Sequence, residues 1–140
     1  MIVQDFMLET VPWHVRVFYH PSPEHTEDII TYLYSIGCDY ESLDDIVMML
    51  DAETVNTGCT HTTPELRESV IIIGITTSAD QFNDTYDHEK GHLAKQICLS
   101  EGIDPYGEEC QYIAGEIGRK MFKAAKRFLC ECCRDKVLNL

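Results

Sequence analysis

The strongest constraint on the fold is the segment Ser69 to Thr77, SVIIIGITT, in which isoleucine, valine and threonine dominate. β-Branched residues favour extended backbone, so this segment predicts a β-strand. The threonine-rich segment Val55 to Thr63 is followed by Pro64 and Glu65, which predict a turn, and we expect a hairpin between the two segments. Trp13 to Tyr19, WHVRVFY, alternates in polarity and predicts a further strand.

Helical patterns occupy most of the remaining sequence. Serine or asparagine caps, capping boxes and terminal glycines mark where the helices begin and end. The four predicted helices cover residues 22–37, 42–50, 85–100 and 108–134. The order of strand, helix, helix, hairpin, helix, helix predicts an α+β fold.

The chain has 140 residues, of which 44% are apolar, and we expect a single domain over residues 1–140. No segment approaches the ~20 apolar residues that cross a bilayer, and no export signal is visible, so we expect a cytoplasmic protein without membrane contact. The seven cysteines are an odd number and are expected to be reduced.

The net charge of −13 argues against binding to nucleic acid, because the phosphate backbone would be repelled. One cluster of basic residues is predicted to be a solvated helix face, with a docking patch as the alternative. Its members are Arg119, Lys120, Lys123, Lys126 and Arg127.

The pentapeptide HEKGH, residues 88–92, contains the main candidates for metal binding and catalysis in the sequence. His88 and His92 are four residues apart, so on a helix they present two imidazoles to the same side, where they can bind one metal ion. Glu89 lies one position further round, where it can accept a proton from a metal-bound water. The alternatives are two exposed histidines on a polar helix face, or a metal site without catalysis.

A catalytic zinc site needs a third protein ligand and an open position. The segment GEECQYIAGEIG offers Glu108, Glu109 and Glu116 at the start of the next predicted helix. A short turn joins that helix to the motif helix, so an antiparallel pair is expected to bring these glutamates close to the histidines.

With HEKGH and this downstream glutamate, the sequence resembles the gluzincins, the thermolysin-like zinc metallopeptidases, and in particular their small bacterial and phage members. The pattern E-x-x-x-x-A spans Glu109 to Ala114, and the resemblance implies Glu109 as the third zinc ligand, with Glu116 and Glu108 as alternatives. Ile113 stands where thermolysin has an aspartate. The residues after His92 do not continue the metzincin pattern.

The resemblance implies a minimal zincin-like core. Its cleft is bordered by an edge strand, for which we expect Ser69 to Thr77, and the long helix after the motif carries the third ligand. It also implies a zinc metalloendopeptidase that acts on a protein or peptide: Zn²⁺ activates a water and Glu89 is the general base. The alternative is a non-catalytic metal-binding or phage-related structural protein.

Other candidate residues are weaker. Cys130 and Cys133 form a CxxC pattern that is either a metal or redox site or simply part of a cysteine-rich chain end. Four further cysteines are isolated in sequence: Cys38, Cys59, Cys98 and Cys110. His61 is expected either to face the cleft or to be solvated, and three tyrosines near the motif are candidates for oxyanion stabilisation, although core positions are expected for them: Tyr86, Tyr106 and Tyr112.

Overall fold

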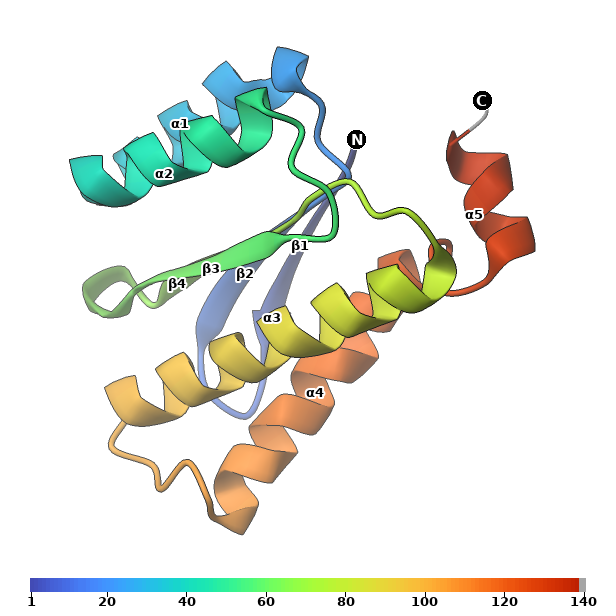
Figure 1. The fold of residues 1–140 in the computed structure, drawn as a ribbon. Coiled ribbons are helices and arrows are strands. Elements are labelled where there is room, and N and C mark those ends of the chain that lie inside the picture. The colour runs from blue at the N-terminus through green and yellow to red at the C-terminus, as the bar shows by residue number, and fades with distance from the viewer. Residues whose placement is uncertain (139–140) are drawn as a thin grey trace.

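The computed structural model describes residues 1–138, in which four strands form one mixed sheet (Figure 1). The strands are β1 (Ile2–Leu8), β2 (Trp13–Tyr19), β3 (Gly58–Thr63) and β4 (Glu68–Ile73). Their order in the sheet is β1-β2-β4-β3, with β2 and β4 parallel and the other two pairs antiparallel. The β3–β4 hairpin confirms the predicted pairing, and β3 is the outer strand on the β4 side of the sheet, while β1 forms the opposite edge.

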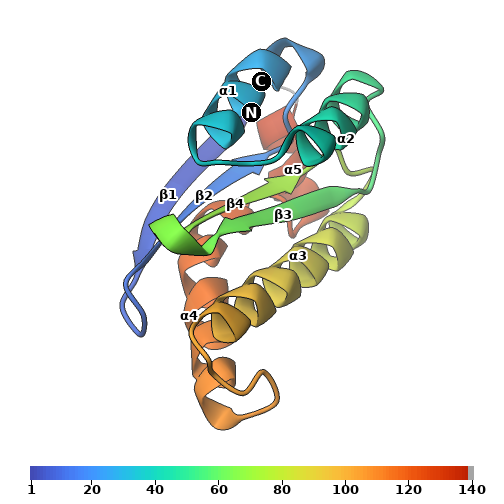
Figure 2. The same cartoon turned by 90° about the vertical axis from the view of Figure 1, so that its left-hand side faces the viewer.

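Helices cover both faces of this sheet (Figures 1 and 2). One face carries α1 (Thr26–Ser35) and α2 (Tyr40–Asp51), and the other carries α3 (Ala79–Ser100) and α4 (Glu108–Ala125). The last helix, α5 (Glu131–Leu138), lies beyond the ends of the strands, and short 3-10 turns occur at Pro23–His25 and Pro64–Leu66. The predicted α+β class is therefore confirmed. No helix within residues 1–138 is both long and apolar enough to cross a membrane.

The sheet separates two hydrophobic cores, and β4 contributes to both. Ile71 and Ile73 pack into the core beneath α3 and α4, whereas Val70 and Ile72 point to the core beneath α1 and α2. Side chains alternate across a strand, so a strand that is covered on both faces is apolar at every position. This explains the unbroken apolar run that dominates the sequence.

Three expectations about the sheet need correction. Strand β1 was not predicted, although its burial alternates along the strand. The strand expected over 69–77 ends at Ile73. It is an inner strand, because β3 pairs along its outer side, so the edge of the sheet beside α3 is β3 and not β4.

Two helix boundaries also differ from the prediction. Helix α3 begins at Ala79, six residues before the predicted start, because the Ser78 side chain accepts a hydrogen bond from the Gln81 N–H and caps the helix. The long helix predicted over 108–134 is divided into α4 and α5. Between them Phe128 is only 1% exposed and stacks on the rings of Tyr19 and Phe82.

Candidate metal centre on helix α3

Two histidine side chains converge on the surface of α3. The Nε2 atoms of His88 and His92 are 3.0 Å apart, and the two rings are nearly perpendicular, at 85°. Both residues are exposed. The spacing of four residues produces this arrangement, because it stacks the side chains on adjacent turns.

Glu89 lies beneath the outer strand of the sheet. Its residue exposure is 3%, and its Oε1 accepts a 2.9 Å hydrogen bond from the Thr60 hydroxyl on β3. Gly58 makes this close approach possible: a Cβ at this position would lie 2.6 Å from the Ile72 carbonyl oxygen and 3.2 Å from Glu89 Oε2. Glu89 is therefore placed by the backbone of β3 as much as by its own helix.

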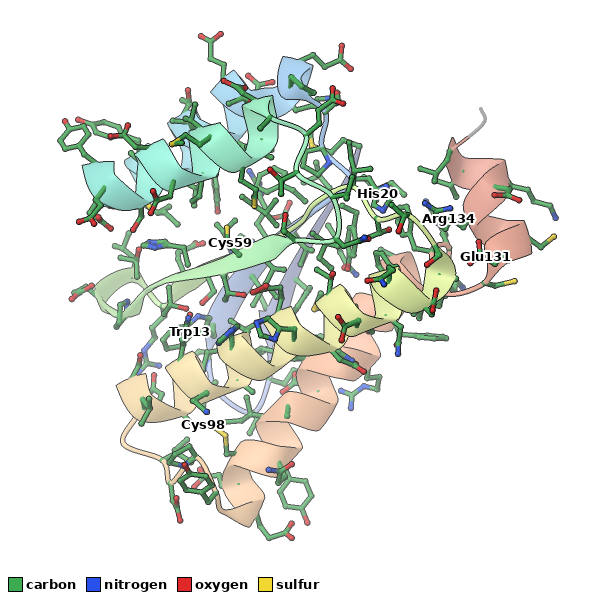
Figure 3. The ribbon with its side chains drawn as sticks, in the orientation of Figure 1. Trp13, His20, Cys59, Cys98, Glu131 and Arg134 are labelled. Atoms are coloured by element: carbon green, nitrogen blue, oxygen red, sulfur yellow. A yellow bond between two sulfur atoms is a disulfide. The ribbon has the colours of Figure 1, made fainter. Side chains whose placement is uncertain are left out.

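A second contact joins β3 to α3 about two helical turns further along the helix. The Thr62 hydroxyl donates to Gln96 Oε1 at 2.6 Å and lies 2.7 Å from Ser69 Oγ. Ser69 Oγ in turn accepts from the Trp13 indole N–H at 2.9 Å. Figure 3 shows Trp13 between the sheet and α3. This polar network therefore joins the sheet to the helix that carries the motif.

A cavity of about 310 Å³ opens beside the first two residues of the motif. Its walls are His88, Glu89 and two earlier residues of α3, Asp84 and Thr85, together with residues 56–58 at the entrance to β3. The cavity thus contains the carboxylate-bearing residue of the motif and one of its two imidazoles.

The structure does not bring Glu109 to the histidines. Helix α4 packs on the side of α3 that carries Tyr86, Ala94 and Cys98: the Tyr86 hydroxyl donates to the Gly118 carbonyl at 3.2 Å, and Cys98 is bonded to Cys110. At about 100° per residue, His88 and His92 lie roughly 150° around the helix from that side. Glu109 is exposed in the first turn of α4.

Glu116, the alternative ligand, has a structural role. It is 4% exposed, and its carboxylate accepts hydrogen bonds from the N–H groups of Glu9 and Thr10, at 2.6 and 3.0 Å, in the turn between β1 and β2. Burial alone would raise the pKa of Glu116, but these donors and the nearby Lys120 ammonium lower it to about 2. Within residues 1–138, no group of three or more histidine, cysteine or acidic side chains is arranged to hold a metal.

The remaining candidates lie away from the motif. His61 is on β3 but has the opposite parity to Thr60, so it points to the α2 side of the sheet, where it lines a cavity with Cys59. Tyr86 is buried and bound to α4, as expected for a core residue. Tyr106 and Tyr112 are 87% and 69% exposed.

The expectation that all seven cysteines are reduced is wrong for two of them. Cys98 and Cys110 form a disulfide, visible in Figure 3 where α3 and α4 meet. Their Cα atoms are 6.0 Å apart, within the range that a disulfide spans. The short turn between two antiparallel helices produces this proximity, which the spacing in the sequence did not reveal.

The residues that sequence reasoning missed are on β3. Thr60 and Gly58 position Glu89, and Thr62 holds Gln96. The signal in the sequence is the alternation of polar residues in GCTHTT, in which Gly58, Thr60 and Thr62 share one face of a strand.

Comparison of the chain with protein-family models, with curated proteins and with solved structures found no match in any of the three. The resemblance to the gluzincins therefore rests on the residues of the motif and of the helix that follows it.

Proposed function

We propose that this chain is a zinc-dependent peptidase whose centre is formed by His88, Glu89 and His92. The observation that carries the proposal is the convergence of two imidazole nitrogens beside a cavity that Glu89 also lines. The four-residue spacing of His88 and His92 explains why their rings converge, but it does not explain the cavity beside them.

The histidine pair fits a zinc ion. Two nitrogen ligands of one tetrahedral zinc, each bound at about 2.0–2.1 Å, lie about 3.3 Å apart. The two Nε2 atoms are 3.0 Å apart, a distance that also suits a hydrogen bond between two neutral imidazoles. A ligand role for Glu109 would require α4 to repack. The proposed centre therefore has two of the three protein ligands that a catalytic zinc site ordinarily uses, His88 and His92, and leaves the other positions to water and substrate.

When bound, zinc would polarise a carbonyl group and lower the pKa of a water molecule. The chain itself supplies a proton acceptor, since Glu89 lines the cavity next to His88. Thr60 holds Oε1, while Oε2 lies against the Gly58 wall of the same cavity. General bases contribute about 10²–10⁴-fold to rate.

The position of β3 favours a peptide as substrate. Because β3 pairs only with β4, its other side is outside the sheet, and it passes directly over Glu89. An extended peptide can add to such a strand through main-chain hydrogen bonds. This would place a peptide bond beside the motif without deep side-chain pockets.

A non-catalytic metal-binding protein is the second candidate, and one observation favours it. The Glu89 carboxylate is almost fully buried and already hydrogen-bonded to Thr60, as expected for a side chain that holds β3 on α3. In that case the histidine pair binds metal and Glu89 has no part in chemistry.

The replacement Glu89→Gln distinguishes the two candidates. Glutamine can still accept the Thr60 hydrogen bond but cannot take a proton at neutral pH, so zinc binding should persist while cleavage falls by about 100-fold or more. The assay is incubation of the zinc-loaded chain with a peptide library, with new termini identified by mass spectrometry. Zinc binding without any cleavage would leave only the non-catalytic candidate. Equal cleavage by wild type and Glu89→Gln would show that Glu89 is not the proton acceptor and would overturn the proposed centre.

A further inference from the structure

The beginning of α5 carries three exposed cysteines that the proposed peptidase does not use. Cys130 directly precedes the helix, and its carbonyl oxygen accepts the Arg134 N–H at 2.8 Å, which makes Cys130 the N-terminal cap. Cys133 follows three residues later, on the next turn of the same helix start, and is also exposed. Residues three apart on a helix are neighbours, so a small local adjustment of the exposed helix start brings the two sulfurs within bonding distance.

The surroundings of the two sulfurs differ. Cys130 lies at the helix start, where the nearby backbone N–H groups of Cys133 and Cys132 and the Cys133 thiol lower its pKa. The same contact and the charge on Cys130 raise the pKa of Cys133. Of the two sulfurs, Cys130 is therefore the one favoured as the attacking thiolate.

The α5 segment is held in place by its neighbours. Glu131 Oε1 accepts the Ala79 N–H at 2.7 Å, and the Arg134 guanidinium donates to the Thr76 carbonyl oxygen. Figure 3 shows Glu131, Arg134 and His20 together beside the loop that enters α3. The cysteine pair therefore lies on an anchored helix start and not on a free chain end.

We propose that Cys130 and Cys133 form a thiol–disulfide exchange site that reacts with small disulfides such as glutathione disulfide. The Cys130 thiolate attacks one sulfur of the external disulfide, forms a mixed disulfide and releases one thiolate. Cys133 then loses its proton and attacks the Cys130 sulfur, which closes the Cys130–Cys133 bond and releases the second thiolate. The pair is oxidised by two electrons, and the external disulfide is reduced by two.

The test uses the full chain, reduced and then mixed with glutathione disulfide at pH 7. Trypsin releases all three cysteines in one peptide, Phe128 to Arg134, because cleavage follows Arg127 and Arg134. Mass spectrometry should find this peptide lighter by two hydrogens. In Cys133→Ser the reaction should stop at a glutathione adduct on Cys130, while Cys132→Ser should close the disulfide as wild type does.

Alkylation rates supply a second readout. In Cys132→Ser, Cys130 should react with iodoacetamide at least about threefold faster than Cys132 does in Cys130→Ser, since the helix start lowers the pKa of Cys130. A wild-type peptide that stays reduced with excess glutathione disulfide would overturn the proposal. The proposal would also be overturned if the Cys130–Cys133 disulfide failed to form in Cys132→Ser. Equal alkylation rates for Cys130 and Cys132 in the two variants would overturn it as well.

Discussion

The Thr60 hydroxyl donates a 2.9 Å hydrogen bond to Glu89 Oε1, and this contact joins the outer strand of the sheet to the motif helix. The glutamate of HEKGH is therefore packed against the very strand along which a peptide would bind. Whether its carboxylate is a proton acceptor or only a structural group, its position depends on β3.

Removal of the Thr60 hydroxyl should destabilise the fold. Thr60→Val preserves shape but leaves the buried Glu89 oxygen without its donor, and we expect the free energy of unfolding to fall by about 1–3 kcal/mol. Gly58→Ala should have a similar effect, because its Cβ would lie 2.6 Å from a backbone oxygen. Urea denaturation measures both. The exposed Thr31→Val is the matched control, and an equal loss there would contradict the packing role of Thr60.

The two glutamates of α4 should respond differently to replacement by alanine. Glu116→Ala leaves the N–H groups of Glu9 and Thr10 without their acceptor and should lower stability by about 1–3 kcal/mol. Glu109→Ala removes an exposed side chain and should change neither stability nor zinc affinity appreciably. Calorimetric zinc titration of both variants is the measurement. Weaker zinc binding in Glu109→Ala alone would show that α4 repacks in solution to supply the third ligand.

Stability should fall in mild acid because of His20. Burial and the charge of Arg134 lower the pKa of His20 from 6.5 to about 4, so below pH 6.5 the unfolded chain binds a proton more readily than the folded chain. The contribution of His20 is complete above pH 6.5 and is lost progressively as the pH falls toward 4.

His20→Asn provides the comparison for this effect. His20 has a φ of 54°, a conformation that asparagine tolerates. Between pH 7 and 4.5, the free energy of unfolding of wild type should decrease by about 2 kcal/mol more than that of His20→Asn. Parallel stability curves for the two proteins would assign the acid sensitivity to other groups.

The disulfide can be tested by counting thiols. Titration of the denatured, non-reduced chain should find five free thiols, because Cys98 and Cys110 are bonded. Reduction should lower stability by about 3 kcal/mol, the value typical of a short closed loop. A count of seven, with stability unchanged by reductant, would restore the original expectation of reduced cysteines.

Local patterns in the sequence predicted much of the fold. The β-branched run within 69–77, the threonine-rich segment 55–63 and the glycine after α3 identified the hairpin and the motif helix, because these signals act over a few residues. Strand β1 was missed because MIVQDFML alternates only weakly in polarity, and its assignment depends on pairing with β2. The break after α4 was missed because the burial of Phe128 is a tertiary effect.

The candidate site was predictable only in part. The spacing of His88 and His92 fixes their proximity, since it follows from helix geometry alone. The position of Glu109 depends on which side of α3 receives α4, and that side is set by Tyr86, Ala94 and Cys98 in the packed core. A short turn specifies that two helices are neighbours, but it does not specify the rotation of each about its axis.

The most direct test of the central claim is the zinc content of the purified chain after incubation with zinc and dialysis, measured by elemental mass spectrometry. We expect about one zinc per chain for wild type and for His61→Ala, whose side chain lies on the other face of the sheet. His88→Ala and His92→Ala should each retain almost none. A wild-type chain without zinc, or histidine variants that bind as much as wild type, would contradict the assignment of His88 and His92 as metal ligands.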